Sequence, residues 1–354
     1  MSDQTISLDQ LTAFGTSVLT WHGLPHDDAE LVARSLAVAD AWGHPSHGML
    51  RLGWYVARLR SGVMTATTAH TIDVDFGAMA VMDGHDGVGQ VITDRACTEA
   101  VRRARLHGIG VVAVRNSNHF GTAAYWTRRM AEDGFVGILT TNGSPAMAPW
   151  GGREKTVGAN PWSIATPGGS RGAVVLDIAN TNVARGKIYS ALQKGETIPE
   201  SWAISATGEP TTDPQTAIDG ILLPVGAHKG YGISFMMDVL SGVLTGSQFA
   251  TGVVGPYVPD RPSGCGHLVI AIDIDRMIGR DEFDSRIDDL ITLTKGVPLA
   301  TNAAEIFYPG ELENRALVRA ESEGVWLPAK TVEELGQLAA ECEIDFDFES
   351  KAVA

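Results

Sequence analysis

Hydrophobic positions recur at helical spacing over the first sixty residues. The apolar residues within 8–18 fall on one face of a helix. Ser7 and Gln10 stand just before and within this stretch at the spacing of a capping box. Further helices are predicted over 27–42 and from Ser46 to about residue 61, where a glycine follows.

The pattern changes in the middle of the chain, where short apolar runs are separated by turn residues. Such runs are typical of buried strands, and they are predicted at 74–76, 79–82, 109–114, 136–140, 162–166, 174–177 and 267–274. Amphipathic or strongly apolar helices are predicted between them, at 88–107, 123–132 and 229–244. After residue 281 the chain returns to helices, the last over 332–341.

This order of elements predicts an α/β fold of the mixed α+β kind, because helical ends flank a strand-rich middle. We expect a discontinuous helical domain built from residues 1–72 and 275–354. A mixed sheet domain of residues 73–274 would be inserted between its two halves. Both chain ends would then contribute to one core.

Composition and charge narrow the class of protein. The chain has 354 residues, 44% hydrophobic and 19% charged, which is globular composition. Its formal net charge of −15 and its lack of a Lys/Arg-rich run argue against nucleic acid and membrane surfaces as partners. An anionic substrate would therefore have to be drawn by local cations inside a pocket.

The cysteines and the amino terminus bear on the compartment. Three scattered cysteines form no CxxC pair, which fits a reducing compartment. The first residues show neither a basic nor an apolar signal-peptide region. We expect a cytoplasmic protein.

One candidate cluster begins at Ser46-His47. If His47 opens a helix, Arg51 and Tyr55 follow at steps of four residues on the same face. Arginine can grip a carboxylate with two parallel hydrogen bonds, and histidine can move a proton near neutral pH. The same residues could simply cap a helix.

A second candidate is His119, in the polar segment directly after the predicted strand 109–114. Loops at the carboxyl ends of strands commonly carry active sites. His119 could donate a proton to a carbonyl group. Its structural alternative is a histidine of a surface loop or of the core.

Two further segments suit a flat or phosphorylated ligand. The segment 140–152 contains Gly143 and Ser144 among small residues that allow close backbone approach. Lys229 stands among glycines at the start of the apolar helix 229–244, where it could meet a pyrophosphate. A plain irregular loop and a surface lysine are the structural alternatives.

Several familiar motifs are missing. The nearest approach to GxGxxG is Gly87-Val-Gly89-Gln-Val-Ile92, which lacks the third glycine, so a Rossmann fold is not supported. The sequence has no Walker A lysine motif, no HExxH and no GxSxG. The ten histidines lack metal-ligand spacing, and no metal is expected.

Taken together, the segments resemble the type 2 malate/L-lactate dehydrogenases, whose members include ureidoglycolate dehydrogenase, sulfolactate dehydrogenase, diketogulonate reductase and piperideine-2-carboxylate reductase. The matching segments, in the family order, are SHGMLRL (46–52), RNSNHFG (115–121), TNGSPAMAPWGG (141–152), GANPWSIATPGG (158–169), LDIANTNVARGKI (176–188), IPESWAISATGEPTTDP (198–214), LLPVGAHKGYG (222–232) and MDVLSGVLTG (237–246). His44-Pro45 and the segment 262–267 depart from the family pattern.

The resemblance implies a non-Rossmann dinucleotide fold and a homodimer with active sites near the subunit interface. It places the proton carrier at His119, with His47 as the other candidate. Arg51 would hold the substrate carboxylate, and Tyr55 and Ser46 would line the substrate site. The implied cofactor contacts are Gly143, Ser144, Asp177, Ile178, Ala179, Lys229, Gly264, Cys265 and Gly266. The expected cofactor is NAD, with NADP possible.

The expected activity is hydride transfer between a nicotinamide cofactor and a small 2-hydroxy acid or 2-oxo acid of the malate, lactate, ureidoglycolate or sulfolactate type. Three alternatives remain open at this point. They are an NADPH-dependent reductase of cyclic imine-2-carboxylates, a catalytically silent small-molecule binding protein on the same scaffold, and a metal-dependent hydrolase that uses the histidines.

Overall fold

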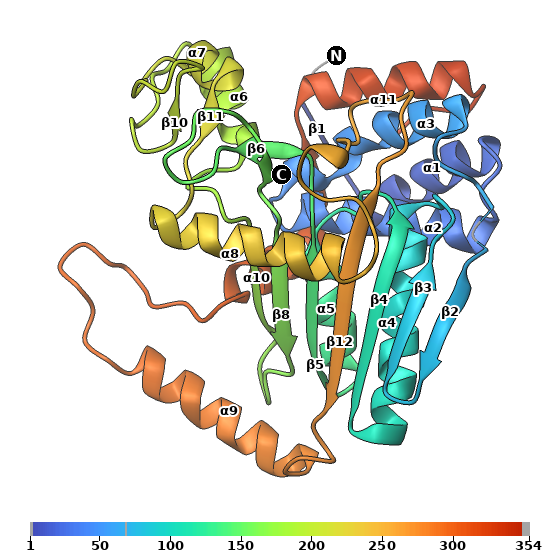
Figure 1. Ribbon diagram of the computed structural model, residues 1–354, viewed down its shortest axis with the longest axis vertical. Coiled ribbons are helices and arrows are strands. Elements are labelled where there is room, and N and C mark those ends of the chain that lie inside the picture. Colours follow the sequence, from blue (N-terminus) through green and yellow to red (C-terminus); the bar gives the residue numbers. More distant parts are fainter. Residues whose placement is uncertain (1–2, 68, 349–354) are drawn as a thin grey trace.

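A seven-stranded sheet runs through the centre of the computed structural model, which describes residues 3–67 and 69–348 (Figure 1). In spatial order its strands are β2 (Thr71–Phe76), β3 (Met79–Asp83), β4 (Ile109–Ser117), β12 (Cys265–Asp273), β5 (Phe135–Thr141), β8 (Trp162–Thr166) and β9 (Val174–Ile178). Only β3 and β4 pair in parallel among these neighbours. Because β4 and β5 both pair antiparallel with β12, their carboxyl ends lie at the same edge of the sheet.

Helices cover both faces of this sheet. On one face, α4 (Gly89–His107) packs against β4 and β12, and α5 (Ala123–Glu132) packs against β5 and β8. On the other face lies α8 (His228–Asp238), which continues into a π-helical turn over Val239–Val243 (Figure 1). The buried Val, Ala and Met residues of β3, β4 and β12 pack against the small residues of α4.

A second layer is helical and draws on both ends of the chain. It contains α1 (Leu8–Trp21), α2 (His26–Ala41), α3 (Leu52–Ser61), α10 (Glu311–Glu323) and α11 (Ala329–Glu341), with β1 (Gln4–Ile6) paired to β13 (Val325–Leu327). One hydrophobic core joins residues 6–64 to residues 320–342. The predicted capping box at the start of α1 is present, with Ser7 and Gln10 bonded reciprocally.

A small third cluster lies beside the sheet. It is formed by β6 (Pro145–Met147), β7 (Val157–Gly158), α6 (Arg185–Lys194), β10 (Ala203–Ile204), α7 (Pro214–Asp219) and β11 (Ile221–Leu222). By contrast, α9 (Arg280–Lys295) reaches away from the body at the lower edge of Figure 1, and Ile291 is its one buried residue.

The structure confirms the predicted fold class, and the seven strands predicted from apolar runs are the strands of the central sheet. The domain boundaries at 72/73 and 274/275 stay a prediction. One element differs: the helix predicted to begin at Ser46 is wrong at its start. Two 3₁₀ turns, Pro45–His47 and Met49–Arg51, come first, and α3 begins only at Leu52.

Candidate active site

Five of the residues singled out in the sequence lie together where α3 meets the end of β4. We call Ser46, His47, Arg51, Tyr55 and His119 the imidazole cluster. The rings of His47 and His119 are stacked, with centroids 5.7 Å apart and planes 18° from parallel. The Tyr55 hydroxyl lies 2.7 Å from Nδ1 of His119. Two segments more than sixty residues apart therefore place two imidazoles and a phenol in contact.

The turn that carries His47 is held by a buried carboxylate. The backbone N–H of Met49 donates to Oδ2 of Asp40 in α2 at 2.6 Å. A side chain on Gly48 would meet that carboxylate at about 2.1 Å, so only glycine fits there. Asp40 thus fixes the bend between the two 3₁₀ turns and with it the position of His47.

Arg51 is half-buried beside His47. Its Nε donates to the backbone oxygen of Ser46 at 2.5 Å, and its guanidinium lies 3.7 Å from the centroid of the Trp54 ring. Within the described part of the chain, no group accepts a hydrogen bond from its two Nη atoms. Those atoms are the fork that would bind a carboxylate in two parallel hydrogen bonds.

His119 is positioned by its own loop as well as by Tyr55. The N–H of Gly121 points at Nδ1 of His119 from 3.4 Å. The preceding residue, Asn118, is buried and donates to the backbone oxygens of Asp86 and Gly87 at 3.0 and 2.9 Å. No described residue hydrogen-bonds Nε2 of His119, so this nitrogen is the ring atom left to exchange a proton with a ligand.

Both candidate proton carriers are neutral in the free protein at pH 7. Burial, together with the neighbouring Arg51 and His44, lowers the pKa of His47 to about 4. Burial and the neighbouring His47 and Arg51 hold the pKa of His119 well below its ordinary value. Burial raises the pKa of Tyr55, so its hydroxyl stays protonated and can donate or accept.

A buried histidine that we did not single out ties this cluster to the next strand. His267 of β12 bonds through Nδ1 to the Thr141 hydroxyl and through Nε2 to the Ser117 hydroxyl, both at 2.8 Å. Burial lowers its pKa to about 3. A neutral His267 therefore bridges the carboxyl ends of β4 and β5.

The end of β5 leads directly into the predicted cofactor loop. Asn142 donates to Asp238 of α8 at 2.9 Å and accepts from the N–H of Gly266 at 3.0 Å. Next to it, Gly143 has no atom within 4 Å of the place a Cβ would take. The Ser144 hydroxyl lies 3.5 Å from the hydroxyl of Tyr257. Gly143 and Ser144 thus present open space beside the fixed Asn142.

Two buried asparagines join this loop to the other predicted cofactor segments. Asn160 accepts from the N–H of Gly143 at 2.9 Å, and Asn180 donates to the backbone oxygen of Asn160 at 2.7 Å. Asn180 directly follows Ile178 and Ala179, and its own backbone oxygen accepts from Val225 just before α8. Lys229, in the first turn of α8, is exposed.

The remaining predicted cofactor residues are occupied within the fold. The carboxylate of Asp177 accepts from the N–H of Ala124 at 2.8 Å and thereby caps α5. The Cys265 thiol is buried against the Ser263 hydroxyl. A side chain on Gly266 would collide with the backbone oxygen of Ser241 at about 1.8 Å. Any ligand contact at Gly264–Gly266 would have to come through the backbone.

Sequence reasoning missed the residues that hold the cluster in place, namely Asp40, Arg58, Gln90, Asn118, Asn142, Asn160, Asn180 and His267. Asn118 and Asn142 stand next to predicted site residues, and that adjacency was the available signal. Gln90 is fully buried, and its side chain lies against the Tyr55 hydroxyl.

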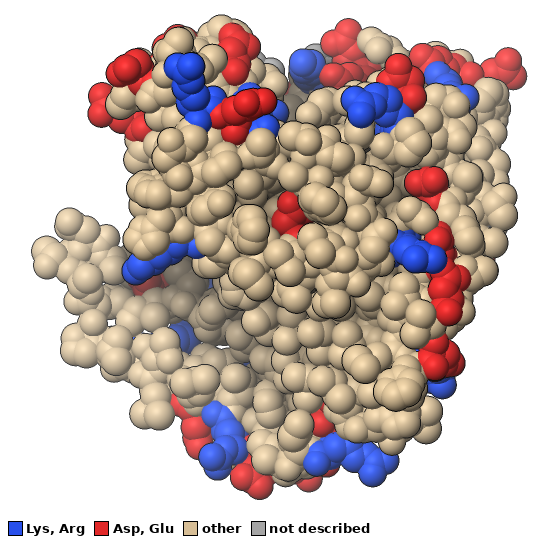
Figure 2. Space-filling view, viewed as in Figure 1, with Lys and Arg blue, Asp and Glu red and all other residues tan. Residues whose placement is uncertain are grey.

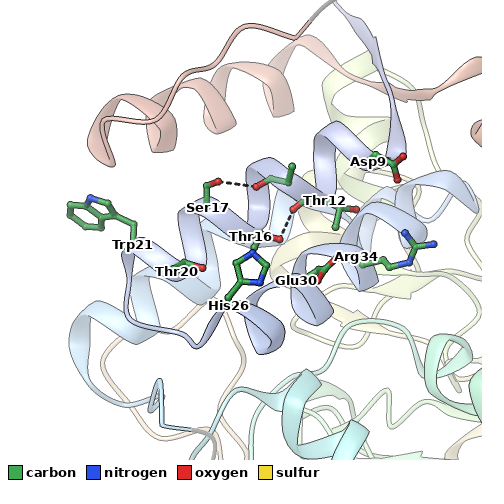
Figure 3. A pocket seen from close by; sticks show the side chains of 10 residues that line it. Asp9, Thr12, Thr16, Ser17, Thr20, Trp21, His26, Glu30 and Arg34 are labelled. Atoms are coloured by element: carbon green, nitrogen blue, oxygen red, sulfur yellow. Dashed lines mark hydrogen bonds between the residues drawn. The ribbon is translucent and has the colours of Figure 1, made fainter.

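A groove of about 690 Å³ elsewhere on the molecule does not involve the imidazole cluster. It lies between α1 and α2 and is lined by Asp9, Thr12, Ala13, Thr16, Ser17, Thr20, Trp21, His26, Glu30 and Arg34 (Figure 3). Its threonine hydroxyls bond to backbone oxygens of α1. Among the described residues, no group of three His, Cys, Asp or Glu side chains could hold a metal ion. No helix in residues 3–67 and 69–348 is both long and apolar enough to cross a bilayer.

Comparisons with a family model, with curated proteins and with solved structures all match dehydrogenases of one family. The family model described as malate/L-lactate dehydrogenase matches residues 6–336. L-sulfolactate dehydrogenase of Methanothermobacter thermautotrophicus is 37% identical over 330 residues, 93% of this chain and 95% of that protein. The solved structure of sulfolactate dehydrogenase from Methanocaldococcus jannaschii superposes with a TM-score of 0.91 at 35% identity, covering 97% of this chain and 98% of that one.

Two other relatives are named for different nucleotides, one for NAD and the other for NADP. The ureidoglycolate dehydrogenase (NAD(+)) of Escherichia coli K12 is 31% identical over 90% of this chain and 91% of its own length. The (2R)-3-sulfolactate dehydrogenase (NADP(+)) of Chromohalobacter salexigens is 37% identical over 76% of this chain and 80% of its own length.

Proposed function

The chain belongs to the malate/L-lactate dehydrogenase family and is a 2-hydroxy acid dehydrogenase, and on that premise we propose which residues carry the reaction. The imidazole cluster binds the acid and moves the hydroxyl proton. The contact between Tyr55 and His119, at 2.7 Å, is the observation that carries the assignment.

The residues present fit a nicotinamide dinucleotide. The space over Gly143 admits a flat ring, and the ammonium group of Lys229 in the first turn of α8 suits a pyrophosphate. When bound, the cofactor supplies or accepts the hydride at C2 of the acid. The named relatives use different nucleotides, and we propose NAD for this chain.

Arg51 binds the substrate carboxylate through its two free Nη atoms. Its Nε bond to Ser46 and its contact with Trp54 fix the plane of the guanidinium, and hence the plane of the carboxylate. Fixing that plane directs C2 relative to His119. Orientation of this kind can contribute about 7–11 kcal/mol to a reaction barrier.

His119 exchanges the hydroxyl proton at Nε2. A bound carboxylate brings negative charge next to the cluster, which raises the pKa of His119 and allows the imidazolium to form. The Tyr55 hydroxyl donates to Nδ1 when that nitrogen is bare and accepts from it when it carries hydrogen. Tyr55 therefore supports His119 both before and after the proton moves.

The decisive test is the nicotinamide absorbance of purified protein with a panel of 2-hydroxy and 2-oxo acids and both nucleotides. We expect turnover with at least one acid, and His119→Ala should abolish it while NADH still binds, as measured by fluorescence. Arg51→Lys should mainly raise KM, because lysine lacks the fork. Unchanged turnover in His119→Ala would remove its proton role.

We also propose that the protein is a homodimer through the face that α8 crosses. Figure 2 shows that the middle of this face is almost free of Lys, Arg, Asp and Glu, which gather along its upper, lower and right-hand margins. Phe235, Met236, Val243 and Leu244 of α8 and the turn after it are each at least half exposed. A second copy of the chain would cover these side chains and the exposed Leu293 of the protruding α9.

The mass in solution tests the dimer. Light scattering after size exclusion should give twice 37.6 kDa for the wild-type chain. Phe235→Asp should give a monomer, whereas Trp21→Asp, at the exposed end of α1, should leave the dimer intact. A wild-type monomer at micromolar concentration would contradict the proposal. We further expect the enzyme in the cytoplasm, where its three free cysteines would stay reduced.

A further inference from the structure

Arg58 of α3 is a buried cation without an ion-pair partner. Its side chain is 1% exposed, and no described carboxylate lies within salt-bridge distance of it. One guanidinium nitrogen donates to Oδ1 of Asn118 at 3.0 Å, and another donates to the backbone oxygen of Val258. The charge of Asp86 acts on Arg58 from beyond ion-pair distance. Burying an arginine with no carboxylate in direct contact is costly, and an apolar residue would be cheaper to bury. The cost indicates a role other than stability.

The first of these contacts acts on the residue before His119. The Asn118 side-chain oxygen accepts a hydrogen bond from Arg58, and its amide nitrogen donates to the backbone oxygens of Asp86 and Gly87. On the far side, Gly89 packs so closely that a Cβ would come within about 2.3 Å of the backbone oxygens of Asn118 and His119. The Asn118–His119 peptide is thus held between Gly89 on one side and the Arg58 guanidinium, through the Asn118 side chain, on the other.

The second contact acts on the segment of residues 253–262, which is buried at its start, exposed toward its end, and in contact with the predicted cofactor loop. Besides the Arg58 bond to Val258, the Ser61 hydroxyl donates to the backbone oxygen of Pro259. The Trp54 ring meets the edge of Tyr257 at 5.9 Å, and Tyr257 in turn reaches Ser144. Trp54, Arg58 and Ser61 form one face of α3, and Tyr55 lies on the neighbouring face.

We propose that Arg58 is a positioning residue, whose guanidinium joins the Asn118–His119 turn to the segment 253–262 and so sets His119 relative to the ring bound over Gly143 and Ser144. The inference rests on the proposed function of His119. It assigns to Arg58 no contact with substrate or cofactor. Its effect is geometric and passes through Asn118.

The test is a double-mutant cycle with Arg58→Lys and Asn118→Ala, measured as kcat and KM. Lysine keeps the charge but cannot reach both oxygens in the fixed geometry of the guanidinium. We expect each single variant to lower kcat by about tenfold or more, since small misplacements can cost about a hundredfold, with KM for the acid within about twofold. The double variant should lose no more than the worse single variant, because both act through one contact.

Arg60→Lys is the matched control. Arg60 lies two residues further along α3, is exposed and pairs with Glu341 at 2.8 Å on the outer surface. It should leave kcat and the melting temperature near those of the wild type. Independent, multiplicative losses in the double variant, or an Arg58→Lys enzyme with unchanged kcat, would overturn the proposal.

A readout without turnover separates this inference from the proposed function. The titratable and charged groups that face His119 are His47, Arg51, Tyr55, Arg58 and His267. In histidine NMR titrations, Arg58→Gln should raise the pKa of His119, and Arg58→Lys should change it less. No change in Arg58→Gln would count against the contact. Wild-type protein that turns over no acid with either nucleotide would instead contradict the proposed function. The titration would still test the contact between Arg58 and the His119 turn.

Discussion

At the scale of single residues, burial keeps the imidazoles of His47 and His119 neutral. One hydroxyl, that of Tyr55, forms a hydrogen bond with the His119 ring. This hydroxyl can donate to or accept from Nδ1 of His119. Neither Arg51 nor His47 contacts that nitrogen in the described structure. The phenol is thus the direct side-chain control on the tautomer of His119.

Removing that hydroxyl should therefore slow the reaction without weakening substrate capture. For Tyr55→Phe we expect kcat to fall about ten- to hundredfold, the equivalent of a lost hydrogen bond to a charged group at about 1.5–3 kcal/mol. KM should change little, since the Arg51 fork is intact. Steady-state kinetics on the best acid measures both, and a higher KM with normal kcat would assign Tyr55 to binding instead.

Asp40 gives a prediction for stability against pH. Burial raises its pKa from 3.8 to about 7, so between these values the folded state holds a proton that the unfolded state has lost. This carboxyl therefore makes the wild-type fold less stable as pH rises from 4 to 7. Asp40→Asn removes the titration, and its stability relative to the wild type should rise across that window by up to about 4 kcal/mol. Urea unfolding at pH 4.5 and 7.5 measures this, and parallel curves would show that Asp40 is not buried as a protonated acid.

The sequence revealed the residues of the imidazole cluster better than the charged residues that support them. His47, Arg51 and Tyr55 were found by their spacing, although a bend at Gly48 and not a continuous helix brings them together. Asp40 and Arg58 escaped notice, because a charged residue in a helix pattern is normally assigned to the solvent side. Only tertiary packing shows that both are buried.

At the scale of elements, close contacts between α4 and the sheet fix the distance between α4 and β4. Gly110 of β4 lies under α4, and a Cβ there would stand about 1.9 Å from the backbone oxygen of Ala100. Because that neighbour is helix backbone, it cannot move aside without shifting α4. Since β4 carries Asn118 and His119 at its end, the packing also sets the site.

Gly110→Ala should accordingly destabilise the protein by about 1–3 kcal/mol or more through overpacking. Gly53→Ala is a suitable control, because Gly53 is helical and its nearest neighbour would be 4.0 Å from the new carbon. That change should be neutral or stabilising by up to about 1 kcal/mol. Thermal or urea unfolding compares the free energies of unfolding of the two variants. Equal values would show that α4 can shift away from β4 at little cost.

The strands of the central sheet were easier to predict than the shorter strands, and burial did not decide this, because β2 is mostly exposed whereas β7 and β11 are buried. Strands of the central sheet stood out as apolar runs, and α4, α5 and α11 as amphipathic patterns. The two- and three-residue strands β6, β7, β10, β11 and β13 were not predicted, nor were α6 and α7. The short strands contain too few residues for a period to appear, and they are fixed by long-range pairing, as between Thr5 and Trp326.

At the scale of the whole molecule, the exposed apolar face along α8 should make stability depend on concentration. If two copies cover it, the unfolding equilibrium includes dissociation, and mass action raises the melting temperature with protein concentration. We expect a rise of several degrees between about 0.5 and 50 µM, with none for Phe235→Asp. Differential scanning fluorimetry across that range measures the effect. A constant melting temperature in the wild type would argue against association.

The position of β12 has a consequence for how the chain is made. This strand lies between β4 and β5, yet it is synthesised after both, separated from β4 by the whole of residues 118–264. While the ribosome works through that stretch, each of the two earlier strands offers an unpaired edge to any neighbouring nascent chain. The sheet of this protein thus emerges in two halves, which are joined only by the last of its seven strands to be synthesised.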